Sequence, residues 1–479
     1  MVKRKFYITT SIAYTNALPH IGFALELIQA DVLARYRRFL DEDVFFLTGT
    51  DEHGAKVAKA AEESGKTPKE FTDKISEKVR ALKEILNLSN DDFIRTTDKK
   101  RHWPAVKKVW LKLKEKGDIY KKKYKGFYCS GCEAFITEKD LVNGKCPNHQ
   151  KKPELVEEEN YFFRLSKYAN EIEEKIKKDK VRIIPETRKN EILSFIKQGL
   201  EDISFSRLRE KLQWGIPVPD DDTQTIYVWP EALVNYISAI GYDKEEKFKK
   251  YWPTDVHCLG KDILKFHALI WLGMLLSLKL ELPKTIFVHG YLTSGGQKMS
   301  KSLGNVIDPF ELVEKYGTDA VRYFLLREIP SSEDGDFTYQ KFEERYNSDL
   351  ASGIGNLVAR ITTLAKNLKP GDLKNIKSDS YKLVEPKINE AWKNCRKHLQ
   401  EFKFNETLKS IWDLISFCDK QIEKEKPWEK KESSILAICC LLHTLEAVAQ
   451  MLSPFLPETS AKIYKGIYKG ISGPLFPRI

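Results

Sequence analysis

The sequence lacks the marks of membrane, secreted and fibrous proteins. Its apolar run Ala268–Leu278 stops at Lys279 and is too short to cross a bilayer, and residues 1–6 have no apolar signal-peptide core. We find no internal repeat and no low-complexity tract. A hydrophobic content of 42% with 31% charged residues excludes collagen, disordered polymers and integral membrane proteins. We therefore expect a globular protein of the cytosol.

Cysteine is sparse as well, with eight residues among 479. In a long chain without a signal peptide, so few cysteines are more typical of thiols or metal ligands than of a disulfide framework. Five of them fall in apolar patterns and are expected to be packing residues: Cys258, Cys395, Cys418, Cys439 and Cys440.

Length and charge set broad limits on organisation and partners. At roughly 150 residues per domain the chain should carry about three domains. Lysine and arginine number 80 against 69 acidic residues, which gives a net charge of +11. This excess of positive charge favours polyanionic partners.

The first fifty residues read as strand, helix, strand. A β-rich run over 5–13 precedes apolar residues spaced three or four apart between Ile21 and Phe39, and a second strand over 44–48 runs into the polar turn 49–54. The rhythm returns with strands over 255–259 and 285–292 around a helix over 262–278. The pattern predicts an α/β fold with a doubly wound, Rossmann-type parallel sheet.

An insertion and a helical region complete the expected organisation. The stretch 116–222 interrupts the sheet, whose halves are 1–115 and 223–293, and looks like a separate small domain. A linker region, 294–343, leads to helical spacing over 344–479, which predicts an α-helical bundle.

Two segments could bind nucleotide phosphates. After the first strand, His20 and Gly22 stand where a helix N-terminus offers free N–H groups to an anion. Downstream, Lys298 and Lys301 lie three apart on a loop made flexible by Gly295 and Gly296. Together these segments predict a site that stabilises charge developing on a triphosphate.

The remaining cysteines predict a metal site. Cys129 and Cys132 form a C-x-x-C turn, and after thirteen intervening residues Cys146 and His149 form a C-x-x-H turn. This spacing is typical of tetrahedral zinc, and four protein ligands leave no open position. We expect structural zinc that holds the insertion together.

The phosphate-binding segments resemble the HIGH-type and KMSKS-type signatures of class I aminoacyl-tRNA synthetases, here His20–Phe23 and Lys298–Ser302. Further segments narrow the resemblance to methionyl-tRNA synthetases: Ser11–Tyr14, Thr50–Gly54, Tyr227–Ala232 with Tyr236, and Gly260–Ile263 with Phe266 and His267. It covers essentially the whole chain. It implies ligation of L-methionine to tRNA(Met), initiator and elongator, through a methionyl adenylate made from ATP with Mg²⁺.

The resemblance also implies the binding residues. Asp51 would hold the α-ammonium group of methionine, and an aromatic and aliphatic pocket would suit its polarisable thioether. The positions matching this site are Ser11, Ile12, Tyr14, Asp51, Trp229, Ala232, Tyr236, Ile263 and His267. ATP would contact His20, Gly22, Gly260, Asp262, Lys298 and Lys301, of which Asp262 resembles the residue that binds the ribose.

In the helical region, Asn356, Arg360 and Trp428 match the positions at which this family recognises the CAU anticodon. Unstacked bases are read by hydrogen bonds to their edges and by stacking on aromatic or arginine planes. The region 344–479 is accordingly expected to bind the anticodon.

Two alternatives stay open at this point. A cysteinyl-tRNA synthetase shares the class signatures but uses zinc inside its amino-acid pocket, whereas here the four ligands lie in the insertion. A non-catalytic tRNA-binding protein on a synthetase scaffold would not need Lys298 and Lys301. Because the chain ends soon after the bundle, we expect a monomer, possibly with a separate tRNA-binding subunit.

One residue departs from the family pattern. The fourth position of the HIGH-type segment, usually histidine, is Phe23. A phenyl ring cannot donate a hydrogen bond to a phosphate oxygen, so partial compensation by neighbouring donors is expected.

Overall fold

The structure is a computed structural model of the chain. It describes residues 3–129, 134–136, 141–147, 150–243, 245–299, 304–366, 368, 370–429, 432–469 and 474–479. The chain divides into two compact units. The first comprises Met1–Pro19, Leu40–Lys83 and Ser89–Val288, and the second comprises His20–Phe39, Glu84–Leu88 and His289–Ile479.

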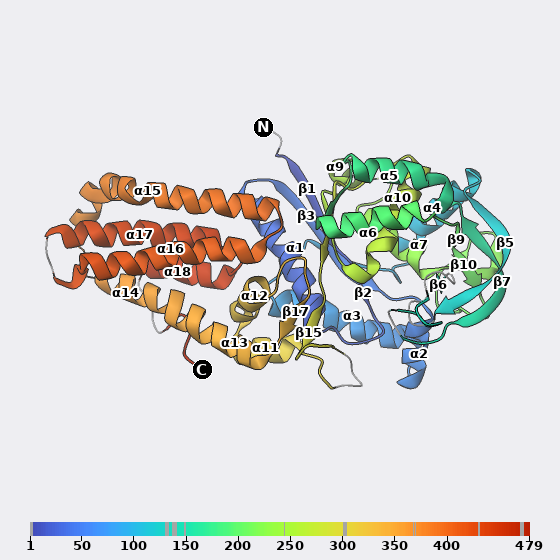
Figure 1. The fold of residues 1–479 in the computed structure, drawn as a ribbon, viewed down its shortest axis with the longest axis horizontal. Coiled ribbons are helices and arrows are strands. Elements are labelled where there is room, and N and C mark those ends of the chain that lie inside the picture. The colour runs from blue at the N-terminus through green and yellow to red at the C-terminus, as the bar shows by residue number, and fades with distance from the viewer. Residues whose placement is uncertain are drawn as a thin grey trace. The chain divides into compact units, whose positions relative to one another are not determined.

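A seven-stranded sheet forms the centre of the first unit (Figure 1). Its order is β2-β3-β1-β13-β14-β8, with β4 beside β3, and the pairs β1–β3, β1–β13, β2–β3, β3–β4 and β8–β14 are parallel. The strands are β1 Lys5–Thr10, β2 Ala13–Tyr14, β3 Asp43–Asp51, β4 Asp92–Arg95, β8 Arg182–Ile184, β13 Val256–Gly260 and β14 Thr285–His289.

The sheet is buried almost throughout, as expected where helices cover both faces of parallel strands. All residues of β13 and all but the first of β3 are buried. The helices of this unit are α2 Ala55–Glu63, α3 Pro68–Ile85, α4 His102–Glu115, α5 Ala169–Lys177, α6 Glu186–Lys197, α7 Val228–Leu233, α8 Asn235–Ser238, α9 Glu246–Tyr251 and α10 Leu272–Leu278. The doubly wound sheet predicted from the sequence is therefore present.

Two predicted elements differ in the structure. Strand β3 continues to Asp51 because Thr50 pairs with Ala13 of β2 and with Arg95 of β4, so part of the predicted turn 49–54 is strand. The predicted helix over 262–278 is broken into a short 3-10 turn, Lys261–Ile263, a π-helical turn, Phe266–Trp271, and α10.

Small antiparallel sheets fill the predicted insertion. One has the order β6-β5-β7-β9 and the other β10-β12-β11. Their strands are β5 Ile119–Cys129, β6 Ala134–Ile136, β7 Glu154–Phe163, β9 Ile203–Ser204, β10 Ser206–Leu208, β11 Pro217–Val218 and β12 Asp221–Ile226. Strand β8, from the same stretch, pairs with β14 in the main sheet, so the stretch 116–222 is not entirely separate from that sheet.

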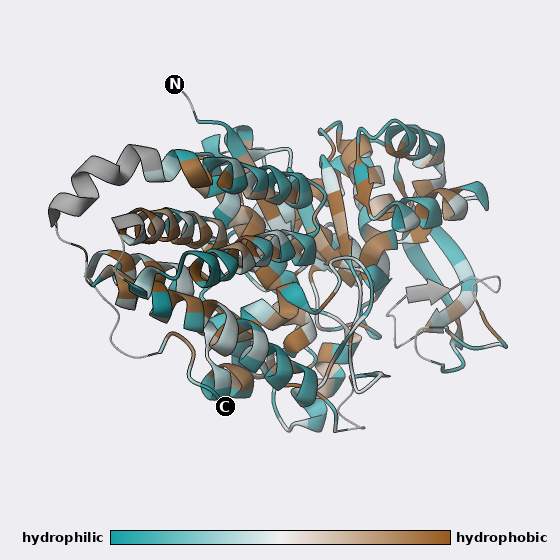
Figure 2. Cartoon of the chain, turned by 60° about the vertical axis from the view of Figure 1, so that its left-hand side comes forward, coloured by the Kyte–Doolittle hydropathy of each residue, from teal (hydrophilic) through white to brown (hydrophobic). Residues whose placement is uncertain are grey.

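The second unit begins with α1 Ile21–Phe39 and ends in a bundle whose helices α15 to α18 lie side by side (Figure 1). Its elements are β15 Leu292–Ser294, β16 Gln297–Lys298, β17 Gly335–Phe337, α11 Pro309–Tyr316, α12 Thr318–Arg327, α13 Tyr339–Arg345, a π-helical segment Tyr346–Gly355, α14 Asn356–Ala365, α15 Pro370–Gln400, α16 Phe404–Glu425, a 3-10 turn Pro427–Glu429, α17 Glu432–Leu452 and α18 Pro457–Lys469. Figure 2 shows the bundle helices marked with both teal and brown residues, as amphipathic helices around a core should be.

One helix within the helical region predicted over 344–479 is strongly apolar. Ser434–Leu452 in α17 is long and apolar enough to cross a membrane by length and composition, with a mean hydropathy of 1.9. More than half of this segment is buried inside the protein, where α15, α16 and α18 pack against it. We interpret it as the core helix of the bundle.

A buried arginine ties α1 to the bundle within the second unit. Arg322 on α12 is fully buried and forms an ion pair of 2.8 Å with the equally buried Asp31 of α1. Its remaining donors reach the carbonyl oxygens of Leu86, Pro454 and Phe455 at 2.7 to 3.0 Å. Because the two charges are paired and the guanidinium also donates to three carbonyl oxygens, this contact holds α1 and the α17–α18 turn in a fixed relation.

Candidate active site

The carboxyl ends of three neighbouring strands bring the first group of predicted residues together. Ser11 follows β1, and its amide donates to the carbonyl of Cys258 in β13 at 2.9 Å. Tyr14 lies opposite Asp51 in the β2–β3 pair. The Asp51 carboxyl is almost completely buried. In parallel sheets this edge is where ligands bind, so an anionic group stands at a ligand-binding edge.

Tyr236 and His267 form a hydrogen-bonded pair in the same unit. The Tyr236 hydroxyl and His267 Nε2 are 2.7 Å apart, and His267 Nδ1 lies 3.0 Å from the carbonyl oxygen of Ile263. Because that carbonyl can only accept, Nδ1 carries the proton and Nε2 accepts from Tyr236. Burial lowers the pKa of His267 to about 4, so the pair is uncharged at neutral pH.

Two further residues support Tyr236 and were not predicted as site residues. His257 of β13 lies under the Tyr236 ring, with ring centroids 4.3 Å apart, and its Nδ1 is 2.7 Å from Thr9 Oγ1. The hydroxyl of Tyr7 donates to the Tyr236 carbonyl at 2.7 Å. Burial also lowers the pKa of His257 well below its usual value. The floor of this region is therefore aromatic, polar and uncharged.

Trp229 provides an aromatic wall. It stacks on Phe266 with ring centroids 3.5 Å apart, and it packs with Tyr14 against one small hydrophobic cluster. Ile12 and Ile263 pack against the main core that contains Tyr236, and Ala232 is buried. On one side of Trp229 lies a cavity of about 120 Å³, which Phe266, Ile270 and Tyr227 help to line. All predicted methionine positions thus lie in the first unit.

The two residues expected beside the ATP ribose follow β13. Gly260 is its last residue and is buried, whereas Asp262 is exposed in the 3-10 turn that follows. A carboxylate at the carboxyl end of a parallel strand is well placed to accept hydrogen bonds from ribose hydroxyls.

His20 caps the N-terminus of α1 in the second unit. The amide of Gly22 donates to His20 Nδ1 at 3.0 Å, which leaves Nε2–H as the outward donor. A Cβ on Gly22 would come within 2.8 Å of the His20 ring, so only glycine permits this approach. His20 is exposed as a residue, yet the protein around its ring and the charge of Lys298 lower its pKa.

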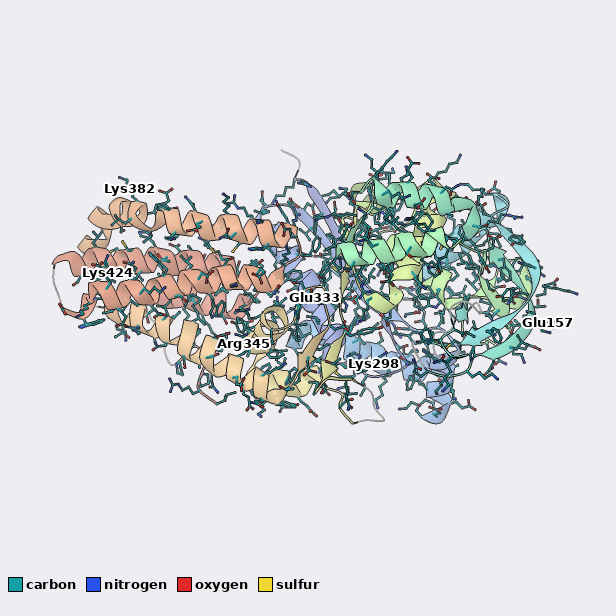
Figure 3. The ribbon with its side chains drawn as sticks, viewed as in Figure 1. Glu157, Lys298, Glu333, Arg345, Lys382 and Lys424 are labelled. Atoms are coloured by element: carbon teal, nitrogen blue, oxygen red, sulfur yellow. The ribbon has the colours of Figure 1, made fainter. Side chains whose placement is uncertain are left out.

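Lys298 and Met299 stand close to this cap. Met299 Cε lies 3.8 Å from the position that a Cβ on Gly22 would take, and Lys298, labelled in Figure 3, lies 5.2 Å from the Tyr291 ring centre. The Lys298 side chain is exposed and positively charged. Lys301 lies outside the described residues.

A buried ion pair joins Glu26 of α1, one turn beyond Phe23, to His289 at the end of β14. It was not predicted from the sequence. His289 Nε2 is 2.9 Å from Glu26 Oε2, and His289 Nδ1 is 2.8 Å from the carbonyl oxygen of Gly290. Both nitrogens face acceptors, which suits a doubly protonated ring. An isolated histidine at the end of a strand gave no signal in the sequence, because its partner comes from another element.

Of the four predicted zinc ligands, Cys129 and Cys146 are described. Both are buried and belong to one small cluster, against which Leu141 packs. Cys132 and His149 lie outside the described residues. Among the residues that are described, no group of three or more histidine, cysteine or acidic side chains could hold a metal ion.

The predicted anticodon residues lie on α14 and in the turn that follows α16, whose last turn contains Lys424, labelled in Figure 3. Asn356 is exposed on α14, and Arg360 on the same helix pairs with Asp419 and Glu423 of α16 at 3.4 and 2.6 Å. Trp428, in the turn after α16, is 49% exposed. An exposed tryptophan and an arginine each offer a planar surface for stacking.

Of the packing cysteines predicted from the sequence, Cys258, Cys395, Cys418 and Cys439 are buried and Cys440 is half-buried. Burial raises the pKa of Cys395 and Cys418 to about 12. These thiols are therefore unreactive packing groups.

Known proteins resemble the chain along its whole length. Residues 6–154 and 140–362 match the sequence family "tRNA synthetases class I (M)", and residues 382–475 match the "Anticodon-binding domain of tRNA ligase". The methionine–tRNA ligase of Caldanaerobacter subterraneus subsp. tengcongensis is 45% identical over 97% of this chain and 74% of its own. That of Thermotoga maritima is 44% identical over 97% of this chain and 75% of its own.

Solved structures agree. The Mycobacterium tuberculosis methionyl-tRNA synthetase in complex with methionyl-adenylate aligns with a TM-score of 0.91 at 35% identity, over 99% of this chain and 100% of that chain. The apo form of that synthetase aligns with a TM-score of 0.83 at 33% identity, over 100% of this chain and 98% of that chain. On this evidence the chain belongs to the methionyl-tRNA synthetases, class I enzymes that ligate L-methionine to tRNA through methionyl adenylate.

Proposed function

We propose that the first unit binds methionine through two chemically different surfaces. The Asp51 carboxylate accepts charge-assisted hydrogen bonds from the α-ammonium group. The thioether lies against Trp229, Tyr14 and Ile12, with Ser11, Ala232 and Ile263 completing the pocket and Tyr236 and His267 at its floor. The observation that carries this assignment is the uncharged Tyr236–His267 pair, whose hydrogen bond leaves the floor polar without a net charge.

Binding of ATP is divided between residues for its phosphates and residues for its ribose. Gly22 and His20 at the start of α1, together with Lys298 and Lys301, bind the phosphates, and Asp262 with Gly260 holds the ribose. The tautomer of His20 supports this role, because its Nε2–H donor is directed away from the Nδ1 that accepts from Gly22. Mg²⁺ accompanies ATP and neutralises phosphate charge.

Adenylate formation then needs little chemistry from side chains. The methionine carboxylate attacks the α-phosphorus and pyrophosphate leaves, so the protein contributes by positioning the two substrates and by stabilising negative charge. His20 and the two lysines supply that stabilisation. The methionyl group then passes to the terminal adenosine of tRNA(Met), and AMP is released.

The bundle supplies tRNA recognition in this scheme. Asn356 hydrogen-bonds to base edges, and Arg360 and Trp428 offer stacking planes for the anticodon of initiator and elongator tRNA(Met). The exposure of Trp428 supports the assignment, since its ring is open to solvent and can stack on a base. The chain acts as a monomer in the cytosol, with or without a separate tRNA-binding subunit.

Zinc completes the insertion. Cys129, Cys132, Cys146 and His149 would hold the ion, which would stabilise the region around β5 and β6. The burial of Cys129 and Cys146 in one small cluster supports this, because so small a cluster contributes little stability by itself.

The methionine site is tested with the Asp51→Asn variant. Pyrophosphate exchange should show a higher KM for methionine, because the amide has lost the charge that attracts the ammonium, while the KM for ATP should hardly change. 4-(Methylthio)butanoate, which lacks the amino group, should inhibit the variant and the unmodified enzyme about equally. An unchanged KM for methionine in Asp51→Asn would rule out this site.

A further inference from the structure

A buried carboxylate with two histidines lies between the segments that carry the methionine residues. Glu231 of α7 is fully buried, and its Oε1 is 3.0 Å from His53 Nδ1 and 3.2 Å from His102 Nε2. Both imidazoles are buried as well. Burial alone opposes ionisation of Glu231, but the two imidazoles outweigh it, so that the pKa of the carboxyl is lowered. The group is therefore a buried anion stabilised by imidazole donors.

The three side chains come from different elements of the first unit. His53 follows β3, His102 opens α4, and Glu231 lies in the middle of α7. His102 is also bonded to Ser238 of α8 through Nδ1, at 2.9 Å. The Glu231 carboxylate of α7 thus contacts both the end of β3 and the start of α4.

His53 is held firmly on its other sides. Its ring packs between Trp103 and Trp214, with centroid distances of 5.9 and 5.3 Å. The indole nitrogen of Trp214 donates to the carbonyl of Glu52 at 2.5 Å, and the Gly54 amide donates to the Trp214 carbonyl at 3.1 Å. Because the ring has little freedom, movement of Glu231 is transmitted to the segment around residues 51–54.

The contact connects the two chain segments that carry the surfaces proposed for methionine. Asp51 precedes His53 by two residues, whereas Trp229 precedes Glu231 by two and Ala232 follows it. The ammonium-binding carboxylate and the thioether-binding wall are thus joined by a short path through one ion pair. A buried charge is costly, and an apolar side chain would pack the same space with greater gain in stability. A requirement for an accurate distance between Asp51 and the Trp229 wall explains why a carboxylate occupies position 231.

We propose that Glu231 is a positioning residue for methionine, which sets the distance between Asp51 and the Trp229 wall by holding His53. The proposal rests on the assignment of Asp51 to the α-ammonium group. Glu231 itself does not touch substrate, since its side chain is completely enclosed. It acts on the part of the affinity that depends on the amino group.

The test is the isosteric variant Glu231→Gln, assayed with L-methionine and with 4-(methylthio)butanoate, which lacks the ammonium. Equilibrium binding of both ligands is measured, together with KM for ATP. We expect methionine to bind about tenfold more weakly, because a charge-assisted bond to Asp51 is misaligned. Binding of the deaminated ligand and the KM for ATP should stay within about twofold. His53→Gln removes the other partner of the Glu231–His53 contact and should show the same pattern of affinities. It provides the test if Glu231→Gln does not fold.

Asp118→Asn is the matched control. Asp118 is also a buried carboxylate of the first unit, and it accepts from Lys167, Tyr168 and Ser277 at 2.5 to 2.7 Å. Its variant should lose stability without changing the ratio of the two affinities. The proposal would be overturned if Glu231→Gln left the ratio of the affinities for methionine and for 4-(methylthio)butanoate unchanged, as it would be if both ligands bound equally more weakly. If Asp51→Asn itself kept the wild-type ratio of these two affinities, the assignment of Asp51 to the α-ammonium group would be wrong. This result distinguishes a failure of the methionine site from a failure of the Glu231 proposal.

Discussion

At the scale of single residues, the proton arrangement around His20 determines what this side chain can do. Its Nδ1 accepts from Gly22, so the ring presents one N–H donor outward. Phe23 cannot donate at all, so the proposed phosphate site relies on His20, Lys298 and Lys301. The reaction should depend on His20 more strongly than in a site with two histidines.

His20→Ala should therefore lower the rate of methionine-dependent pyrophosphate exchange by at least about a hundredfold, the loss typical of one oxyanion donor. Phe23→His should give exchange that is equal or faster, because it restores a donor. Both variants are compared at saturating methionine and ATP. Unimpaired exchange in His20→Ala would show that the start of α1 is not the phosphate site.

The buried His267 gives a pH dependence of stability. Its pKa is lowered to about 4 in the folded protein, against about 6.5 for an unperturbed imidazole. Between these values the unfolded chain binds a proton that the folded protein does not. The free energy of unfolding should therefore rise with pH across this interval, by about 1.4 kcal/mol per pH unit from this group, and level off above it.

Urea unfolding of the wild-type protein and of His267→Gln between pH 4.5 and 6.5 measures this contribution. The slope of the free energy of unfolding against pH should be smaller in the variant, because no histidine at position 267 takes up a proton on unfolding. The same measurement on a glutamine variant of the half-buried His398, in the second unit, serves as a control for the loss of an imidazole elsewhere in the chain. Identical slopes in His267→Gln and the wild type would mean that the ring is protonated in the folded state.

At the scale of elements, the turn after α16 carries the sharpest expectation for tRNA. Trp428→Ala removes a stacking surface worth roughly 1 to 3 kcal/mol per base, so the efficiency of aminoacylation should fall by about tenfold to a hundredfold. Adenylate formation should be almost unaffected. Equal losses in both half-reactions would identify Trp428 as a packing residue.

The insertion is tested through its cysteines. Replacing both Cys129 and Cys146 by serine should release zinc and disorder the β5–β6 region, while the main sheet keeps its fold. Metal analysis of the purified variant gives the zinc content, and circular dichroism monitors the rest of the chain. Stoichiometric zinc in the double variant would exclude these ligands.

Several of these elements could be predicted from the sequence, because local patterns determine them. The spacing of apolar residues marked α1, and polar loops after apolar strands marked the ligand-binding edge of the sheet. The end of β3 could not be predicted, since Thr50 and Asp51 are polar and enter the sheet only through pairing with β2 and β4. Edge strand β8 was missed because it too enters the sheet only through pairing, in its case with β14.

The Glu231 contact shows a second limit. His53 and Glu231 are 178 residues apart and meet only in the folded chain. The available signal was a single carboxylate within the apolar run 228–234, which indicates burial but not a partner. Likewise, the sequence placed Tyr236 and His267 in one pocket by resemblance, whereas their tautomers follow from distances.

At the scale of the whole molecule, the two units carry different proposed roles. The methionine pocket and the ribose-binding residues are proposed for the first unit, whereas the start of α1, Lys298 and the anticodon residues of the bundle belong to the second. Within the second unit, the Arg322–Asp31 pair connects α1 to the bundle, so the proposed phosphate-binding and tRNA-binding ends belong to one compact body.

All the roles proposed for this protein serve one reaction, the selective activation of methionine. ATP–pyrophosphate exchange with each of the twenty amino acids in turn, followed by aminoacylation of tRNA(Met), measures this selectivity. We expect exchange with L-methionine, and at least about a hundredfold less with cysteine, which lacks the methylene and methyl groups that fill the pocket. Exchange that is equal or faster with cysteine, or absent with methionine, would contradict it.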